Sequence, residues 1–149
     1  MGLKLNLGCG KDIRQGWENV DLTGPVVVDL TAYPWPWDDG SVEEISALHL
    51  VEHLPSLVAF MDECHRIMAP GGTLYLETPH PLCEWFWQDP THVRGYTVNT
   101  FAYYFTDAIY PSADYGIRHW PASECGEFEV AEAAGIPAGA RVVWAKLTR

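Results

Sequence analysis

The sequence predicts an α/β fold built on an open, mostly parallel sheet, and three observations carry that prediction. The first half of the chain contains short β-branched or alternating apolar runs, which are typical of buried strands. Among these runs, the apolar residues of Ser56–Met68 recur at i, i+4, i+7 and i+11, the pattern of one amphipathic helix. The last third contains two strand-like runs, Glu127–Val130 and Arg141–Leu147, which predict a C-terminal antiparallel hairpin.

The remaining elements follow from local patterns along the chain. Tyr33–Gly40 is punctuated by proline and ends in glycine, so it is predicted as loop. A second helix is predicted over Val98–Ala108. Residues 79–95 have neither the helix nor the strand period, and a loop of that length favours a lid or acceptor loop. The whole chain, 1–149, is predicted as a single domain. The expected strands of the first half are Lys4–Leu7, Trp17–Asp21, Val26–Leu30, Val42–Leu50 and Thr73–Thr78.

The first connections are too short for ordinary crossover helices. Only nine residues (Gly8–Gly16) separate the first two expected strands, and four (Leu22–Pro25) separate the next two. A parallel crossover normally takes about a dozen residues or more. We therefore expect the helices at this edge of the sheet to be reduced to turns or lost.

Composition limits the partners of the chain. Twenty acidic and nine basic residues among 149 give a net charge of −11, and the basic residues are scattered. Such a charge repels phosphate backbones, so a nucleic-acid partner is not expected. The four cysteines lie far apart without a Cys-x-x-Cys pair, which favours free thiols and a cytoplasmic location. Neither a signal peptide nor a membrane span is expected.

The glycine-rich turn after the first expected strand favours a nucleoside ligand. Gly8-Cys9-Gly10 follows Lys4–Leu7, and Asp21 ends the next expected strand. Glycine lets the backbone pass close to a ligand, and an acid at the tip of the second strand can accept hydrogen bonds from both ribose hydroxyls. By itself this pattern is weak, because such turns also occur for steric reasons alone.

An ordered set of short motifs resembles the class I S-adenosylmethionine-dependent methyltransferases, particularly their compact type-11-like group. No single motif is specific, but together they span about half of the chain in the family's order. The resemblance implies a Rossmann-like sheet of seven strands whose last strand, Arg141–Leu147, is antiparallel. The motifs are Leu5–Gly10, Gly16–Leu22, Val28–Leu30, Trp37–Ile45, Leu50–Leu54 and Arg66–Leu74.

The resemblance also implies S-adenosyl-L-methionine as the cofactor and assigns residues to it. The glycine turn would pass under the methionine portion and ribose, Asp21 would hold the ribose diol, and Asp29 and Leu30 would border the adenine. His49 would lie near the sulfonium. The sequence departs from the family in Asn6, where many members carry an acid, and in Asp12, which replaces a third glycine. The implied cofactor-binding residues are Asn6, Gly8, Cys9, Gly10, Asp21, Leu22, Asp29, Leu30 and His49.

Three histidines are candidate general bases for methyl transfer. His49 and His80 follow neighbouring expected strands, and His92 lies in the expected lid. Ligands of open α/β sheets gather outside the carboxyl ends of the strands, so we expect His49 and His80 to face the same crevice. Imidazole also has a pKa suited to proton transfer near neutrality. A cluster is predicted, rather than any one of the three.

A zinc peptidase is an alternative interpretation of His49–His53, which matches H-x-x-E-H. That chemistry needs both histidines on one helical face, whereas the preceding residues read as strand and Pro55 restricts the turn. We therefore predict no metal, and Glu52 and His53 are expected to act at the start of a helix or behind the catalytic residues.

Other functions remain open at this stage. A shortened domain could bind S-adenosylmethionine or another nucleoside without catalysis, as a sensor or partner subunit. A dehydrogenase is disfavoured because the first loop lacks G-x-G-x-x-G. The acceptor could be a small molecule, a glycan or a peptide. A second copy of the chain, as a homodimer, could cover a thin sheet edge.

Overall fold

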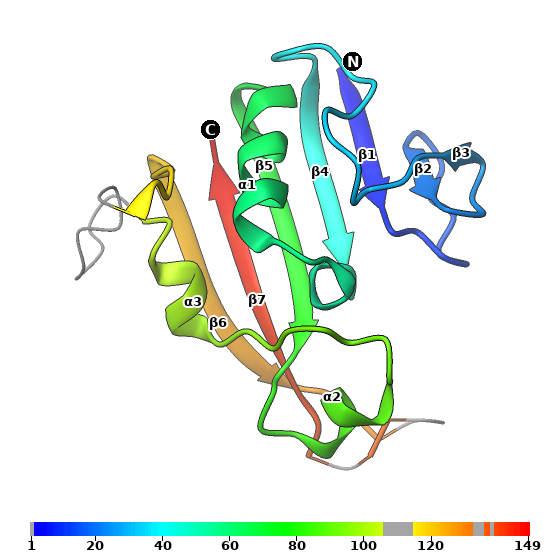
Figure 1. The fold of residues 1–149 in the computed structure, drawn as a ribbon, viewed down its shortest axis with the longest axis vertical. Helices are drawn as coiled ribbons and strands as arrows, with labels where there is room; N and C mark the ends of the chain where they lie inside the picture. Colours follow the sequence, from blue (N-terminus) through cyan, green and yellow to red (C-terminus); the bar gives the residue numbers. More distant parts are fainter. Residues whose placement is uncertain (1, 106–114, 133–135, 138) are drawn as a thin grey trace.

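Seven strands form one sheet in the order β3-β2-β1-β4-β5-β7-β6 in the computed structural model, which describes residues 2–105, 115–132, 136–137 and 139–149 (Figure 1). The first five strands are parallel to one another, whereas β7 runs antiparallel to both β5 and β6. The predicted mostly parallel, seven-stranded sheet with a C-terminal antiparallel pair is thereby confirmed. The strands are β1 (Leu3–Leu7), β2 (Glu18–Asp21), β3 (Val26–Val27), β4 (Val42–Leu48), β5 (Met68–Pro79), β6 (Ala122–Glu129) and β7 (Arg141–Thr148).

The helices are few and short. The helices are η1 (Val51–His53, a 3-10 turn), α1 (Leu57–Ile67), α2 (Glu84–Gln88) and α3 (Val98–Ala102). In the described residues no helix connects β1 to β2 or β2 to β3, as the short connections predicted. The longer connection from β3 to β4, all of it described, also has no helix and contains the predicted loop Tyr33–Gly40. No helix of the described part is long and apolar enough to cross a membrane.

Two expected elements are shorter in the structure than predicted. The expected strand Val26–Leu30 stays in the sheet only for its first two residues, because β3 is an edge strand that pairs with β2 alone. Val27 is 69% exposed, so the inference that this run is buried on both faces was wrong. The second expected helix ends at Ala102, since Phe105 forms a bridge with Trp120; residues 106–108 lie outside the described residues.

Helix α1 is held over the sheet by its apolar face. Phe60, Met61 and Cys64 are buried in the same core cluster as the sheet residues Leu74 and Leu76. The helix begins after Ser56, whose Oγ accepts a hydrogen bond from the Ala59 N–H (3.2 Å). Figure 1 shows α1 lying across β5.

The proline-rich loop 33–40 fills the space that a helix before β4 would occupy. Arg66 of α1 donates to the carbonyl oxygens of Trp35 (3.1 Å) and Trp37 (3.0 Å), and Glu63 accepts from the Trp35 N–H (2.7 Å). The Trp35 ring packs edge-on against Phe60 at 5.8 Å between centroids. A loop tied in this way covers the apolar sheet face without helical hydrogen bonds.

The two faces of the sheet differ in character. On the face under α1, the alternating residues of β5 and β7 are apolar and buried. On the opposite face, Lys4 pairs with Glu44 (2.6 Å) and Tyr75 stacks on Trp144 at 6.3 Å between ring centroids. The connection between β1 and β2 lies against part of this face, since Arg14 donates to Ser46 Oγ (2.8 Å) and Lys4 lies over the Trp17 ring. The side chains of this face are thus polar and aromatic.

Candidate functional site

The turn after β1 requires glycine at its first position. Gly8 has a φ of 66°, in the left-handed region that side chains rarely adopt. A Cβ at Gly8 would stand 3.0 Å from Leu50 Cδ1 and 3.1 Å from Leu50 Cβ. Gly10 also has a positive φ, 49°, but a Cβ there would meet nothing within 4 Å. The backbone at Gly8 thus passes close to the residues that follow β4.

Asp21, the last residue of β2, is fixed beside this turn. Its Oδ2 accepts from the Gly10 N–H (2.9 Å), and its Oδ1 accepts from the Leu22 N–H (2.7 Å). The Cys9 N–H donates to the Val20 carbonyl oxygen (3.0 Å), which continues the pairing of β1 with β2 into the turn. The carboxylate is therefore positioned by backbone groups, with lone pairs remaining on both oxygens.

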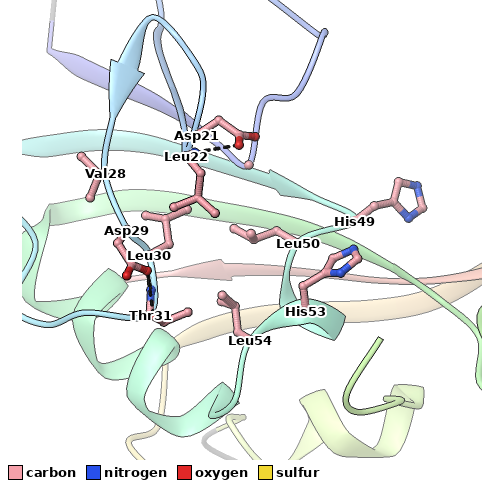
Figure 2. Close-up of a pocket in the computed structure, with 11 residues that line it drawn as sticks. Asp21, Leu22, Val28, Asp29, Leu30, Thr31, His49, Leu50, His53 and Leu54 are labelled. Atoms are coloured by element: carbon pink, nitrogen blue, oxygen red, sulfur yellow. Dashed lines mark hydrogen bonds between the residues drawn. The ribbon is translucent and has the colours of Figure 1, made fainter. Parts of the chain in front are cut away.

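A cavity of about 340 Å³ opens at the carboxyl ends of β1, β2 and β4. This volume is within the usual range of small-molecule sites, about 300–1,000 Å³. Figure 2 shows Asp21 and Leu22 on one side, with His49, Leu50, His53 and Leu54 on the other. The lining residues are Gly8, Asp21, Leu22, Val28, Asp29, Leu30, Thr31, His49, Leu50, His53 and Leu54.

The segment after β3 forms a third wall of this cavity. Asp29 Oδ1 accepts from both the N–H (2.9 Å) and the hydroxyl (2.7 Å) of Thr31. The Thr31 hydroxyl first, and then its N–H, lower the pKa of the Asp29 carboxyl, so the group is a carboxylate at neutral pH. Leu30 is buried beside it. An ordered carboxylate next to an apolar side chain can bind a flat ring, because the carboxylate accepts hydrogen bonds from the ring edge and the apolar side chain packs against the ring face.

Three of the expected cofactor residues do not line the cavity. Asn6 points to the other face of the sheet, where its amide donates to Asp12 O (2.7 Å) and Asn19 Oδ1 (3.1 Å) and fastens the turn. Cys9 is buried, and burial followed by the Asp21 charge raises the pKa of its thiol, so it packs as a neutral residue. Gly10 contributes the N–H that orients Asp21.

His49 lies between two cavities. It follows β4 with a φ of 52°, the left-handed region in which a non-glycine residue is strained. Its N–H donates to the Glu77 carbonyl oxygen (2.8 Å), which holds it at the sheet edge. The ring lies 5.3 Å from Trp85 between centroids, and Nδ1 is 3.7 Å from Glu52 Oε1. His49 lines both this cavity and the next one.

The second cavity, of about 500 Å³, lies under the segment 79–95. Glu52 and His53 reach it from η1, and His92 reaches it from the covering segment. Glu52 is fully buried, and His92 is buried except for 8% of its side chain. The lining residues are His49, Glu52, His53, Pro79, Trp85, Gln88, Asp89, Pro90 and His92.

The structure brings His49 and His92 together but places His80 elsewhere. His80 is 4% exposed and lines neither cavity. Its Nδ1 accepts from the Leu82 N–H (3.1 Å), and its Nε2 lies 3.2 Å from Glu127 Oε1. With both nitrogens engaged, His80 joins the end of β5 to β6. The expectation that His49 and His80 face the same crevice was therefore wrong, and His49 shares the second cavity with His92 instead.

Sequence reasoning missed several residues of these cavities. Val28, Thr31 and Leu54 line the first one, and Trp85 and Asp89 line the second. The H-x-x-E-H motif contains Glu52 and His53, but it was interpreted as a peptidase motif, so it did not predict that these two residues line a cavity. Val28 and Leu54 belong to the motifs Val28–Leu30 and Leu50–Leu54, and Trp85 and Asp89 belong to the expected lid, so the segments were identified but not these side chains. Which side chains of a segment face a cavity depends on tertiary contacts.

The comparisons with known proteins agree with this architecture. Residues 9–76 match the family model described as a methyltransferase domain. A relative from Mycolicibacterium smegmatis, named as an S-adenosylmethionine-dependent methyltransferase, is 27% identical over 82 residues, which are 55% of this chain and 30% of that protein. The match thus spans less than a third of the relative's length.

Two solved structures are similar over almost the whole chain. A SAM-dependent methyltransferase from Archaeoglobus fulgidus superposes with a TM-score of 0.72 at 18% identity, covering 99% of this chain and 86% of that one. The methyltransferase in a complex with the Trm112 activator from Haloferax volcanii gives 0.61 at 15% identity, covering 98% and 82%. At these identities the likeness is one of fold.

Proposed function

We propose that this chain is a class I methyltransferase, which transfers a methyl group from S-adenosyl-L-methionine to a small or medium-sized acceptor. Its fold and the methyltransferase-domain model that its residues 9–76 match support the proposal. One observation carries the proposal: Gly8 and Asp21, from the ends of two neighbouring strands, line the same cavity. That arrangement supports a nucleoside at the carboxyl edge of the sheet.

The first cavity would hold the cofactor. The oxygens of Asp21 retain lone pairs for the ribose hydroxyls, since each accepts only one backbone hydrogen bond. Asp29 and Leu30 would border the adenine, with Thr31 keeping the Asp29 carboxylate in place. The methionine portion would pass the turn at Gly8 toward His49. Asn6, Cys9 and Gly10 would act behind this surface, by shaping the turn.

The second cavity would take the acceptor. It shares His49 and His53 with the first, so a methyl group directed past these side chains would enter it. The segment 79–95, with Trp85 of α2 against His49, would be the lid over this cavity and exclude water from the reacting atoms. The charge of −11 favours a small molecule, a glycan or a peptide over nucleic acid.

The chemistry needs alignment of nucleophile, methyl and sulfur, which the two adjoining cavities would provide. For a hydroxyl or amine acceptor a base adds about 10²–10⁴-fold. Of the three candidate bases His49, His80 and His92, His49 is best placed for this role, because it lines both cavities and its side chain is 39% exposed. His92 also reaches the acceptor side, whereas His80 would be a structural residue.

Location and assembly complete the proposal. We place the enzyme in the cytoplasm because all four cysteines are free thiols. A second copy of the chain could cover the two-residue edge strand β3.

Calorimetric titration with S-adenosylmethionine and S-adenosylhomocysteine tests the cofactor assignment, with NADH as the comparison ligand. We expect saturable binding of the first two and none of NADH. A screen of hydroxyl, amine and thiol acceptors for release of S-adenosylhomocysteine then tests turnover. Absence of binding at millimolar ligand would refute the proposal, and binding without turnover on any acceptor would favour a cofactor-binding module instead.

A further inference from the structure

Three donor side chains converge at the floor of the second cavity. Glu52 and His53 come from η1, and His92 comes from the segment that covers it. One ligand-type atom of each, a carboxylate oxygen or a ring nitrogen, lies within 4.8 Å of the others. The rings of His53 and His92 are 4.7 Å apart between centroids. Glu52 and His53 are adjacent in the chain, whereas His92 is distant in sequence and reaches them only through the tertiary fold.

Glu52 has no hydrogen-bond partner for its carboxylate. Its side chain is completely buried, and neither Oε1 nor Oε2 accepts a hydrogen bond. Two histidine nitrogens, His49 Nδ1 and His92 Nε2, lie 3.7 Å and 3.9 Å from Oε1, outside hydrogen-bond range. A buried carboxylate without a partner costs several kcal/mol in order-of-magnitude terms, so this site needs a cation.

His92 presents a lone pair to that carboxylate. Its Nδ1 lies 2.6 Å from the Phe86 carbonyl oxygen, which can only accept, so Nδ1 carries the ring proton. Nε2 is then the lone-pair nitrogen, and it faces Glu52 Oε1 at 3.9 Å and Asp89 Oδ2 at 3.7 Å. A ring oriented by a carbonyl on one nitrogen, with the other free, is the usual state of a metal-binding histidine.

His53 is oriented in a similar way through Thr91. The Thr91 hydroxyl donates to Asp89 Oδ1 (2.6 Å), so its oxygen is left to accept from His53 Nδ1, 2.9 Å away. That assignment leaves Nε2 of His53 as its lone-pair nitrogen. Asp89 and Thr91 therefore form an outer shell that fixes the ring without occupying its free nitrogen.

We propose that Glu52, His53 and His92 bind one divalent transition-metal ion of the zinc class. Two histidines and one glutamate are a donor set of zinc sites that keep a fourth position open. Metal–ligand bonds of about 2.1 Å place the donors of a tetrahedral site roughly 3.4 Å apart, so small side-chain rotations close the observed separations. The site differs from the sequence prediction of no metal, and also from the peptidase pattern, because His49 is not one of its three ligands.

All three ligands line the cavity assigned to the acceptor, so the open position of a bound ion would face that cavity; this part rests on the proposed function. An acceptor hydroxyl bound there would be more acidic. Its proton would pass to His49, its oxygen would bond to the methyl carbon, and the carbon–sulfur bond would break with its electron pair staying on sulfur. The products would be the methylated acceptor and neutral S-adenosylhomocysteine.

Metal binding can be tested without any acceptor or cofactor. Untagged protein dialysed against a chelator is titrated with Zn²⁺ by calorimetry and with Co²⁺ by visible absorption, and bound metal is counted by mass spectrometry. We expect one ion per chain and a Co²⁺ spectrum of low coordination number. Glu52→Gln and His92→Asn should each weaken metal binding by more than about 100-fold. Loss of an outer-shell partner already weakens metal binding by about 10–100-fold, and these two residues are direct ligands.

Two further variants separate coordination from folding. Thr91→Val, which removes the hydroxyl that orients His53, should weaken binding by about 10–100-fold. His65→Asn, on the far side of α1 against Trp120, should bind metal as the wild type does. Binding of S-adenosylmethionine is measured on each variant, so that loss of the metal site is distinguished from failure of the proposed function. Less than one ion per chain would mean that the site does not hold a metal, and equal affinity in wild type and Glu52→Gln would mean that Glu52 is not a ligand. Either result would overturn the proposal.

Discussion

Substituting Gly8 by alanine tests the close approach between the glycine turn and the residues after β4. The new Cβ would lie 3.0–3.3 Å from three Leu50 side-chain carbons, in a backbone conformation with φ 66°. Gly10→Ala is the matched control, since it has a positive φ of 49° but open space around its Cβ. Both variants incur the left-handed cost of about 1–2 kcal/mol, and both restrict the unfolded chain equally.

The difference between the two variants therefore isolates the contact with Leu50. Overpacking costs about 1–3 kcal/mol. The free energy of unfolding of Gly8→Ala should therefore be lower than that of Gly10→Ala by this amount. Urea unfolding followed by tryptophan fluorescence measures it, since the chain has seven tryptophans. Gly8→Ala should also weaken S-adenosylmethionine binding by more than about tenfold, because a displaced Leu50 intrudes on the cavity that it lines.

A double-mutant cycle completes the test. Leu50→Ala destabilises by itself, but it removes two of the three close carbons, Cγ and Cδ1, and leaves Cβ at 3.1 Å. Combined with Gly8→Ala it should therefore show a favourable coupling of about 0.5–3 kcal/mol. Equal stability of Gly8→Ala and Gly10→Ala, or a coupling near zero, would refute the packing argument.

Three further predictions concern single side chains. Asp21→Asn should weaken S-adenosylmethionine binding by about 10–150-fold, because one charge-assisted hydrogen bond is lost. Asp38→Asn, at an exposed position, is the control and should leave binding unchanged. An unchanged calorimetric Kd for Asp21→Asn would exclude Asp21 as the ribose ligand. Burial acts to raise the pKa of Glu63, but hydrogen bonds, chiefly from Arg66, outweigh it and lower the pKa from its ordinary 4.5. The stability that Glu63 contributes is thus present above about pH 4.5 and is lost as pH falls through the folded-state pKa. In urea unfolding, the free energy of unfolding of wild type should therefore exceed that of Glu63→Gln at neutral pH and not in acid. A difference that does not change with pH would contradict this. His49→Gly should unfold at higher urea than His49→Ala, since only glycine tolerates φ 52° without strain, and the reverse order would show that the strain is absent.

Local patterns predicted the elements whose side chains alternate between core and solvent. The stripe on Ser56–Met68 placed α1 to within a residue at each end, because burial of one face dictates that spacing. The positions of Gly8 and Asp21 in one cavity also followed from order along the chain, since the carboxyl ends of adjacent parallel strands meet. Val26–Leu30 misled the prediction, because an apolar run does not reveal that it lies at the sheet edge.

The sequence by itself determined the sheet, the glycine turn and the acid at the end of β2, since these depend on residue type and short-range periodicity. Only the tertiary structure decided which histidines meet. His80 turns toward Glu127 of the C-terminal hairpin, whereas His92 is carried to Glu52 by a segment without secondary-structure period. The physical reason is that a side chain in an irregular segment is positioned by distant contacts, such as the Val93 N–H on the Glu52 carbonyl oxygen, which no local pattern encodes.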